Sequence, residues 1–148
     1  MSLKSRIQDD AKSAMRAHER EQLATLRLVT AAIKQIEVDE RIELNDEQVL
    51  AVLDKMMKQR RESLEQYEKA GREDLAETER FEMALIQGYL PEPLEEAELT
   101  ELITSTISEV GASSIRDMGS VMSALRSRVQ GRADMKAVSQ AVKTQLTS

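Results

Sequence analysis

The chain has 148 residues, of which 41% are hydrophobic, 32% are charged and 2% are aromatic, and its formal net charge is −6. It contains no cysteine, which excludes disulfides, thiolate metal sites and cysteine nucleophiles. No apolar run approaches the roughly 20 residues that cross a bilayer, and the first ten residues lack the apolar centre of a secretory signal. We therefore expect a cytoplasmic protein with no membrane partner.

Good helix formers such as Ala, Leu, Glu, Lys and Met dominate the composition, whereas five Gly and two Pro leave few turn signals for a sheet. The sequence therefore predicts an all-α fold, in which an N-terminal helical bundle with long helices is followed by a small three-helix tail domain.

Four helices are predicted in the N-terminal part, because apolar residues recur there at spacings of three and four. Their approximate ranges are residues 2–18, 20–39, 46–69 and 73–89. Ser2 is a suitable N-cap for the first helix, Asn45 or Asp46 for the third, and Gly71 suits the left-handed residue that ends the third. Whether the first two segments form one bent helix or two stays open at "AHERE", residues 17–21.

Both prolines of the chain, Pro91 and Pro93, mark a domain boundary, because each disfavours a helix at the residue before it. The predicted domains are residues 1–90 and 94–148. Three helices are expected in the second domain: the first ends at Gly111, the second ends at Gly131, and Asp134 caps the third. The core positions of the second of these helices are Met118, Val121, Met122, Leu125 and Val129.

Charge is unevenly distributed along the chain. Residues 1–91 carry 15 Lys/Arg and 19 Asp/Glu, residues 92–111 carry none and six, and residues 112–148 carry six and two. The negative total argues against general binding of nucleic acid, and no DNA partner is expected. Residues 112–148 nevertheless form a basic segment.

Two interpretations of this basic segment stay open. Arg126, Arg128 and Arg132 lie where cations stabilise the end of a helix dipole, and Lys136 and Lys143 could be a solvated helix face. The excess of cations over acids instead favours contact with an anion. No aromatic residue follows Tyr89, so base stacking is excluded, and shape and phosphate recognition of a folded RNA remains.

Gly119 lies inside the predicted second helix of the tail domain, where glycine costs about 1 kcal/mol relative to alanine. Close approach of another helix or of an RNA backbone would each explain it, and we expect helix packing.

The stretches "KMMKQRRESLEQYEKAGREDLAETERFEMALIQGYLP" and "DMGSVMSALRSRVQGRADMKAVSQAVKTQL" resemble the YqeY-like family, and the resemblance covers the whole chain. The last three helices also resemble the tail domain of the B subunit of tRNA-dependent amidotransferases. The shared signature reads Gly119, Val121 and Met122, then Gly131, Arg132, Ala133 and Asp134. One departure is Asp134 followed by Met135, where many amidotransferase tails have Asn-Pro.

The resemblance implies a tRNA-linked accessory protein that is associated with glutamine-dependent tRNA amidation, a carbon–nitrogen ligase activity with glutamine as amido-N-donor. In the amidotransferases the tail helps to hold the tRNA and the chemistry is done elsewhere. The residues expected to bind tRNA are Gly119, Arg126, Arg128, Gly131, Arg132, Lys136 and Lys143. An aminoacyl-tRNA synthetase or an amidotransferase is the expected protein partner of the N-terminal bundle. The alternative is a helical protein-interaction module with no RNA role, which buries an apolar strip on a partner or on a second copy.

No complete active site is recognisable, so enzyme activity is left open. His18 is the only histidine, and no Ser or acid is spaced to form a triad with it, so we expect a satisfied or half-buried histidine. Glu77, Glu79 and Glu82 lack the histidines of a di-iron bundle and are interpreted as helix surface. The sequence holds no phosphate-binding loop, and no metal or cofactor is expected.

A second basic cluster, Lys58, Arg60 and Arg61, lies in the N-terminal part. Glu62 and Glu65 follow four residues after Lys58 and Arg61, so helical ion pairs are expected to neutralise much of this charge.

Overall fold

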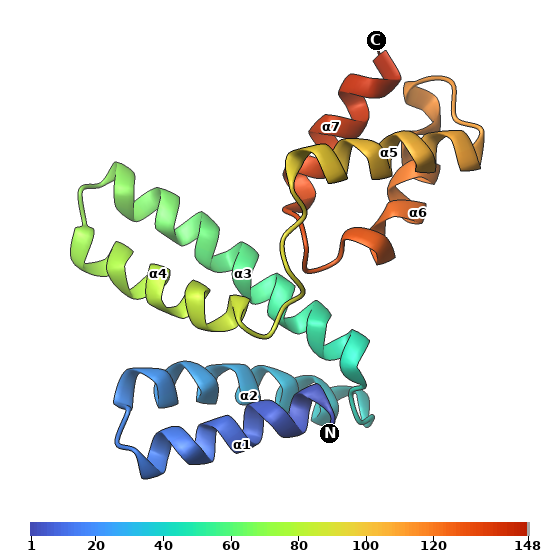
Figure 1. Ribbon diagram of the computed structural model, residues 1–148. Helices are drawn as coiled ribbons and strands as arrows, with labels where there is room; N and C mark the ends of the chain where they lie inside the picture. Colours follow the sequence, from blue (N-terminus) through green and yellow to red (C-terminus); the bar gives the residue numbers. More distant parts are fainter. Residues whose placement is uncertain (148) are drawn as a thin grey trace. The chain divides into compact units, whose positions relative to one another are not determined.

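The computed structural model describes residues 1–147 and confirms the all-α fold (Figure 1). The described residues form seven α-helices and one short 3-10 helix, and none of them lies in a strand. The helices are α1 (Leu3–Arg16), α2 (Arg20–Glu40), α3 (Asp46–Lys69), α4 (Glu73–Gln87), α5 (Glu96–Val110), η1 (Ile115–Asp117), α6 (Met118–Val129) and α7 (Met135–Thr147). The chain divides into two compact units, one of residues 1–90 and one that begins at Pro91.

The N-terminal unit is built from two helical hairpins, in which α1 packs along α2 and α3 packs along α4 (Figure 1). α2 also contacts both α3 and α4, which joins the hairpins into one bundle. The shared core contains fully buried aliphatic side chains from all four helices. Its largest fully buried members are Ile7, Leu26, Leu53 and Ile86.

The segment left open by the sequence, residues 17–21, breaks the chain into two helices rather than bending one. His18 adopts a left-handed conformation with φ of 58°, its N–H donates to the carbonyl of Met15, and the N–H of Glu19 donates to the carbonyl of Ala14. These two bonds form a Schellman motif, which satisfies carbonyls at the end of α1. His18 is therefore exposed at a turn, and the expectation of a half-buried histidine is wrong.

The third helix begins as predicted at the Asn45 cap. Asn45 Oδ1 accepts the N–H of Gln48 at 2.9 Å, and Gln48 Oε1 accepts the N–H of Asn45 at 2.9 Å, which is a complete capping box.

The last residues of the N-terminal unit are held against α1. The Tyr89 hydroxyl donates a hydrogen bond to Asp10, and the guanidinium of Arg6 lies 4.9 Å from the centre of the Tyr89 ring. Burial, and next the hydrogen bond to Asp10, raise the pKa of Tyr89, so this phenol stays protonated as a donor. The end of the bundle is thus fixed before the chain leaves it.

The C-terminal unit contains α5, η1, α6 and α7 around its own apolar core. Its fully buried residues are Ile103, Val121, Leu125, Val129, Val138 and Val142. The N–H of Leu94 donates to the carbonyl of Arg132 at 2.7 Å, so the segment before α5 is fastened to the turn between α6 and α7.

Candidate nucleic-acid interface

The start of α6 is organised by a network around Asp117. Its Oδ2 accepts the N–H groups of Ser113 and Ser114 at 2.9 and 3.3 Å, which closes the turn through η1 into α6. The apolar repeat of α6 then packs into the unit core, and Gly119, Ser123 and Arg126 lie on its exposed side.

Gly119 does not pack against another helix. A Cβ atom added there would meet no heavy atom within 4 Å, and the residue is exposed. The expectation of close helix packing is therefore wrong. The other explanation that the sequence allowed, close approach of an RNA backbone, is compatible with this open position.

Gly131, by contrast, has a purely conformational role. It is buried and its φ is 73°, a left-handed conformation that residues with a Cβ rarely adopt. The N–H of Arg132 donates to the carbonyl of Val129 at 2.8 Å in the same turn. Gly131 therefore shapes the connection between α6 and α7 and presents no surface to a ligand.

Two of the candidate cations are engaged within the C-terminal unit. Arg128 donates to Thr106 Oγ1 at 3.0 Å and pairs with Glu109 at 2.6 Å, both on α5. Arg132 donates through Nε to the carbonyl of Glu92 at 3.0 Å. Both side chains hold other parts of the unit in place, so they are less available to an anion than the sequence suggested.

The remaining candidate cations face solvent. Arg126 on α6 and Lys136 and Lys143 on α7 are exposed, and none of them forms an ion pair with any residue between 1 and 147. Lys136 and Lys143 lie two turns apart, on the side of α7 away from the buried Val138 and Val142.

One further cation of the basic segment was not selected from the sequence. Arg116 in η1 is exposed and likewise forms no ion pair with the part of the chain that the structure describes. Its position in a short turn, outside any apolar repeat, was the available signal.

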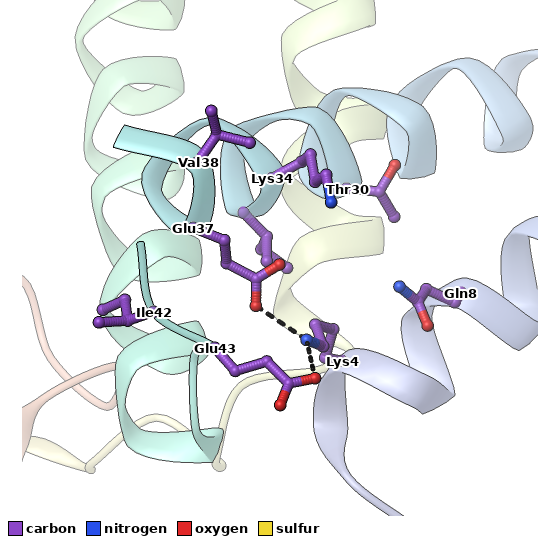
Figure 2. A pocket seen from close by; sticks show the side chains of 9 residues that line it. Lys4, Gln8, Thr30, Lys34, Glu37, Val38, Ile42 and Glu43 are labelled. Carbon is purple, nitrogen blue, oxygen red and sulfur yellow. Dashed lines mark hydrogen bonds and ion pairs between the residues drawn. The ribbon is translucent and has the colours of Figure 1, made fainter. Parts of the chain in front are cut away.

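A polar pocket of about 330 Å³ lies in the N-terminal unit between α1 and α2 (Figure 2). Lys4 bridges Glu37 at 2.8 Å and Glu43 at 3.4 Å, and Gln8 of α1 and Lys34 of α2 also line the pocket. The hydrogen bond to Glu37 raises the pKa of Lys4 above its ordinary 10.5, and the same bond lowers the pKa of Glu37 below 4.5. Lys4 is therefore a charged ammonium at neutral pH and acts as neither a nucleophile nor a base.

The other N-terminal candidates are also structural. Arg60 pairs with Glu82 of α4 at 2.7 Å and donates to the carbonyl of Met56 at 3.2 Å. Burial, and next the charge of Glu82, raise the pKa of Glu79.

Within residues 1–147, no group of three or more His, Asp or Glu side chains is placed to hold a metal ion. No helix of the same residues is long and apolar enough to cross a membrane.

The geometry defines a class of protein: an all-α chain in which a compact four-helix unit precedes a smaller helical unit, whose exposed cations include several that form no ion pair with residues 1–147. The family model described as Yqey-like protein matches residues 4–146, and the chain belongs to this family. This confirms the resemblance seen in the sequence to the YqeY-like family.

Three curated relatives are named "Altered inheritance of mitochondria protein 41, mitochondrial". The protein of Pyrenophora tritici-repentis is 32% identical over 130 residues, which cover 86% of this chain and 71% of the relative. That of Eremothecium gossypii is 39% identical over 85 residues, 57% of this chain and 46% of the relative. That of Clavispora lusitaniae is 34% identical over 114 residues, 75% of this chain and 66% of the relative. The expectation of a cytoplasmic location is contradicted, because these relatives are all named as mitochondrial proteins.

Proposed function

We propose that this protein is a tRNA-linked accessory protein, whose C-terminal unit binds folded tRNA through its phosphates. The observation that carries the proposal is the set of exposed cations on η1, α6 and α7 that no described residue neutralises. These cations are Arg116, Arg126, Lys136 and Lys143. An unpaired surface cation needs no internal bond to be broken before it contacts a phosphate.

The chemistry available on these helices restricts the kind of RNA contact. The C-terminal unit holds no aromatic residue, so it offers no aromatic side chain on which unpaired bases could stack. Cations, serine hydroxyls and the open backbone at Gly119 suit phosphate and ribose groups of a structured RNA instead. We therefore assign the unit a positioning role without sequence readout.

The resemblance of the last three helices to the tail domain of tRNA-dependent amidotransferases supports tRNA as the RNA. Under this proposal the protein is associated with glutamine-dependent tRNA amidation and supplies no catalytic group to it. A synthetase or an amidotransferase is the proposed protein partner. The names of the curated relatives mention mitochondria and no RNA, so the proposal rests on the residues of this chain.

Salt-dependent binding of total tRNA to the full chain tests the proposal. Each phosphate contact should lower the logarithm of the affinity by about 0.7 to 0.9 per logarithmic unit of salt, so three contacts give a slope of about 2 to 3. Replacing Arg126, Lys136 and Lys143 together with Ala should remove most of that slope. Arg128→Ala should reduce it less, because the guanidinium is already held by Thr106 and Glu109.

The matched control is the triple variant of Lys12, Lys55 and Lys58 to Ala. These three lysines are exposed and unpaired within residues 1–147, and their loss changes the net charge equally. Equal loss of tRNA affinity in both triple variants would show only a general charge effect. No tRNA binding at low salt would end the proposal.

A further inference from the structure

The N-terminal unit carries a second surface whose chemistry is opposite to that of the basic segment. A cavity of about 490 Å³ lies between α2 and α4. Its walls are formed by Glu21, Ala24, Thr25, Asp74, Glu77, Thr78, Phe81 and Glu82. We call it the α2–α4 groove.

Apolar groups form part of the lining of this groove, among them Ala24 and Phe81. Phe81, the only phenylalanine of the chain, is 40% exposed. Leu28, which is 47% exposed, follows Ala24 by one turn on the same side of α2. Thr25 is buried, and its hydroxyl is satisfied within α2 because it donates to the carbonyl of Glu21 at 3.0 Å. Exposed apolar side chains that adjoin a cavity supply the apolar contacts that a docked partner would bury.

The rim of the groove is acidic beyond what its ion pairs neutralise. Glu82 is paired with Arg60 of α3, and Asp74 with Arg72. Glu21 and Glu77 are exposed and form no ion pair with any residue in the described range 1–147. The groove therefore presents two carboxylates that no residue in the range 1–147 neutralises, beside the exposed ring of Phe81. This negative charge repels RNA phosphates and attracts cationic groups.

The length of the groove indicates the form of its occupant. At about 1.5 Å per residue, the positions from Glu21 to Leu28 extend over about 11 Å, which matches two turns of a helix. None of the described residues lies in a strand, so the unit offers no sheet edge for an extended peptide. An apolar trough between two helices accepts a third helix through anchors spaced three or four residues apart.

We propose that the α2–α4 groove is the docking site for a cationic amphipathic helix of a partner protein. Leucine-like anchors of that helix would cover Phe81 and Leu28, and its Lys or Arg side chains would face Glu21 and Glu77. This inference goes beyond RNA binding and can fail separately, because the acidic groove and the basic segment of residues 112–148 belong to different units.

The test uses a labelled 14-residue peptide of Leu and Lys with one apolar helical face, titrated into the full chain by fluorescence anisotropy. A counterpart with Glu in place of Lys is the charge control. The Lys peptide should bind and the Glu peptide should not. The double variant Glu21→Gln and Glu77→Gln should weaken binding by about three- to ten-fold, and Leu28→Ser by about ten-fold.

Asp9→Asn with Glu62→Gln is the matched control, because it removes two exposed carboxylates elsewhere on the unit and should leave affinity within about two-fold. Amide shifts on peptide addition should concentrate at Ala24, Thr25 and Phe81. Equal affinity in all variants, or equal binding of the Glu peptide, would overturn the proposal. So would a dimer in light scattering that Leu28→Ser dissociates, since a second copy would then be the occupant.

The same variants separate this proposal from the tRNA role. The groove variants should leave tRNA affinity unchanged, and the triple variant of Arg126, Lys136 and Lys143 should leave peptide affinity unchanged. If both sets of variants impaired both ligands equally, the groove would not be an independent site.

Discussion

The two units of the chain can be compared through what their charged side chains contact. In the N-terminal unit, cations bridge secondary-structure elements: Lys4 joins α1 to Glu37 of α2, and Arg60 joins α3 to Glu82 of α4. In the C-terminal unit, Arg128 makes a comparable bridge, whereas three cations of α6 and α7 form no ion pair with residues 1–147. The comparison teaches that both units fasten their helices with some of their cations and leave others to solvent, so residue type alone does not tell which cations are available to a partner.

The apolar surfaces differ as well. The C-terminal unit buries the repeats of α6 and α7 in its own core, whereas the N-terminal unit leaves Leu28 and Phe81 beside the acidic α2–α4 groove. A cation-rich surface and an acid-rimmed apolar groove suit different partners. The two proposals together describe the chain as an adaptor that brings an RNA and a protein together.

The largest predicted effect tests whether the units are energetically separate. Leu53 and Leu125 are fully buried in different cores, so each change to Ala should cost about 2 to 5 kcal/mol of unfolding free energy. Hydrogen exchange followed by mass spectrometry should show that Leu125→Ala lowers protection in α5–α7 and spares α1–α4. Leu53→Ala should do the reverse. Equal loss of protection in both units for either variant would mean that they unfold as one.

A medium effect distinguishes two glycines of the C-terminal unit. Gly131→Ala should destabilise the unit by about 1 to 2 kcal/mol, because the backbone there is left-handed. Gly119→Ala should instead stabilise it by about 0.5 kcal/mol, since the position is helical and open. Thermal melts measure both changes. If the open position serves an RNA backbone, Gly119→Ala weakens tRNA binding despite the gain in stability, and unchanged affinity would remove Gly119 from the interface.

These glycines also show how far the sequence could predict the molecule. Local signals gave the helix content, the Asn45 cap and the turns at Gly111 and Gly131, because caps and left-handed residues act over a few positions. The exposure of Gly119 depends on which helices pack together, and spacing within one helix carries no information about that.

The candidate site was predicted only in part for the same reason. Arg128 contacts Thr106 and Glu109, which lie 22 and 19 residues away in the sequence. Arg132 contacts the carbonyl of Glu92, which lies 40 residues away. Charge counting found the basic segment but could not separate its engaged cations from its free ones. The α2–α4 groove was not predicted either, because it exists only once two hairpins pack against each other.

The smallest effect at neutral pH is predicted for Lys4→Met, and the pH dependence of its melting temperature tests whether Lys4 bridges α1 and α2 by charge. Lys4→Met removes the ion pair that raises the pKa of Lys4 and lowers that of Glu37. Because the pKa of Glu37 is lowered, the ion pair stabilises the fold at pH values above about 4.5, and this stabilisation is lost as the pH falls. Because the pKa of Lys4 is raised, the ion pair stabilises the fold at pH values below about 10.5, and this stabilisation is lost as the pH rises further. The difference in melting temperature between the parent and Lys4→Met should therefore be full from about pH 5 to pH 10 and shrink outside that window.

Lys12→Met is the control for this experiment, because Lys12 is an exposed lysine of the same helix that forms no ion pair within residues 1–147. Its melting temperature should follow that of the parent chain at every pH. A difference for Lys4→Met that stayed constant from pH 3 to pH 7 would mean that Lys4 acts by the packing of its aliphatic stem. The fastening of α1 to α2 would then be apolar, and Lys4 would no longer be comparable with the ionic bridge that Arg128 makes in the C-terminal unit.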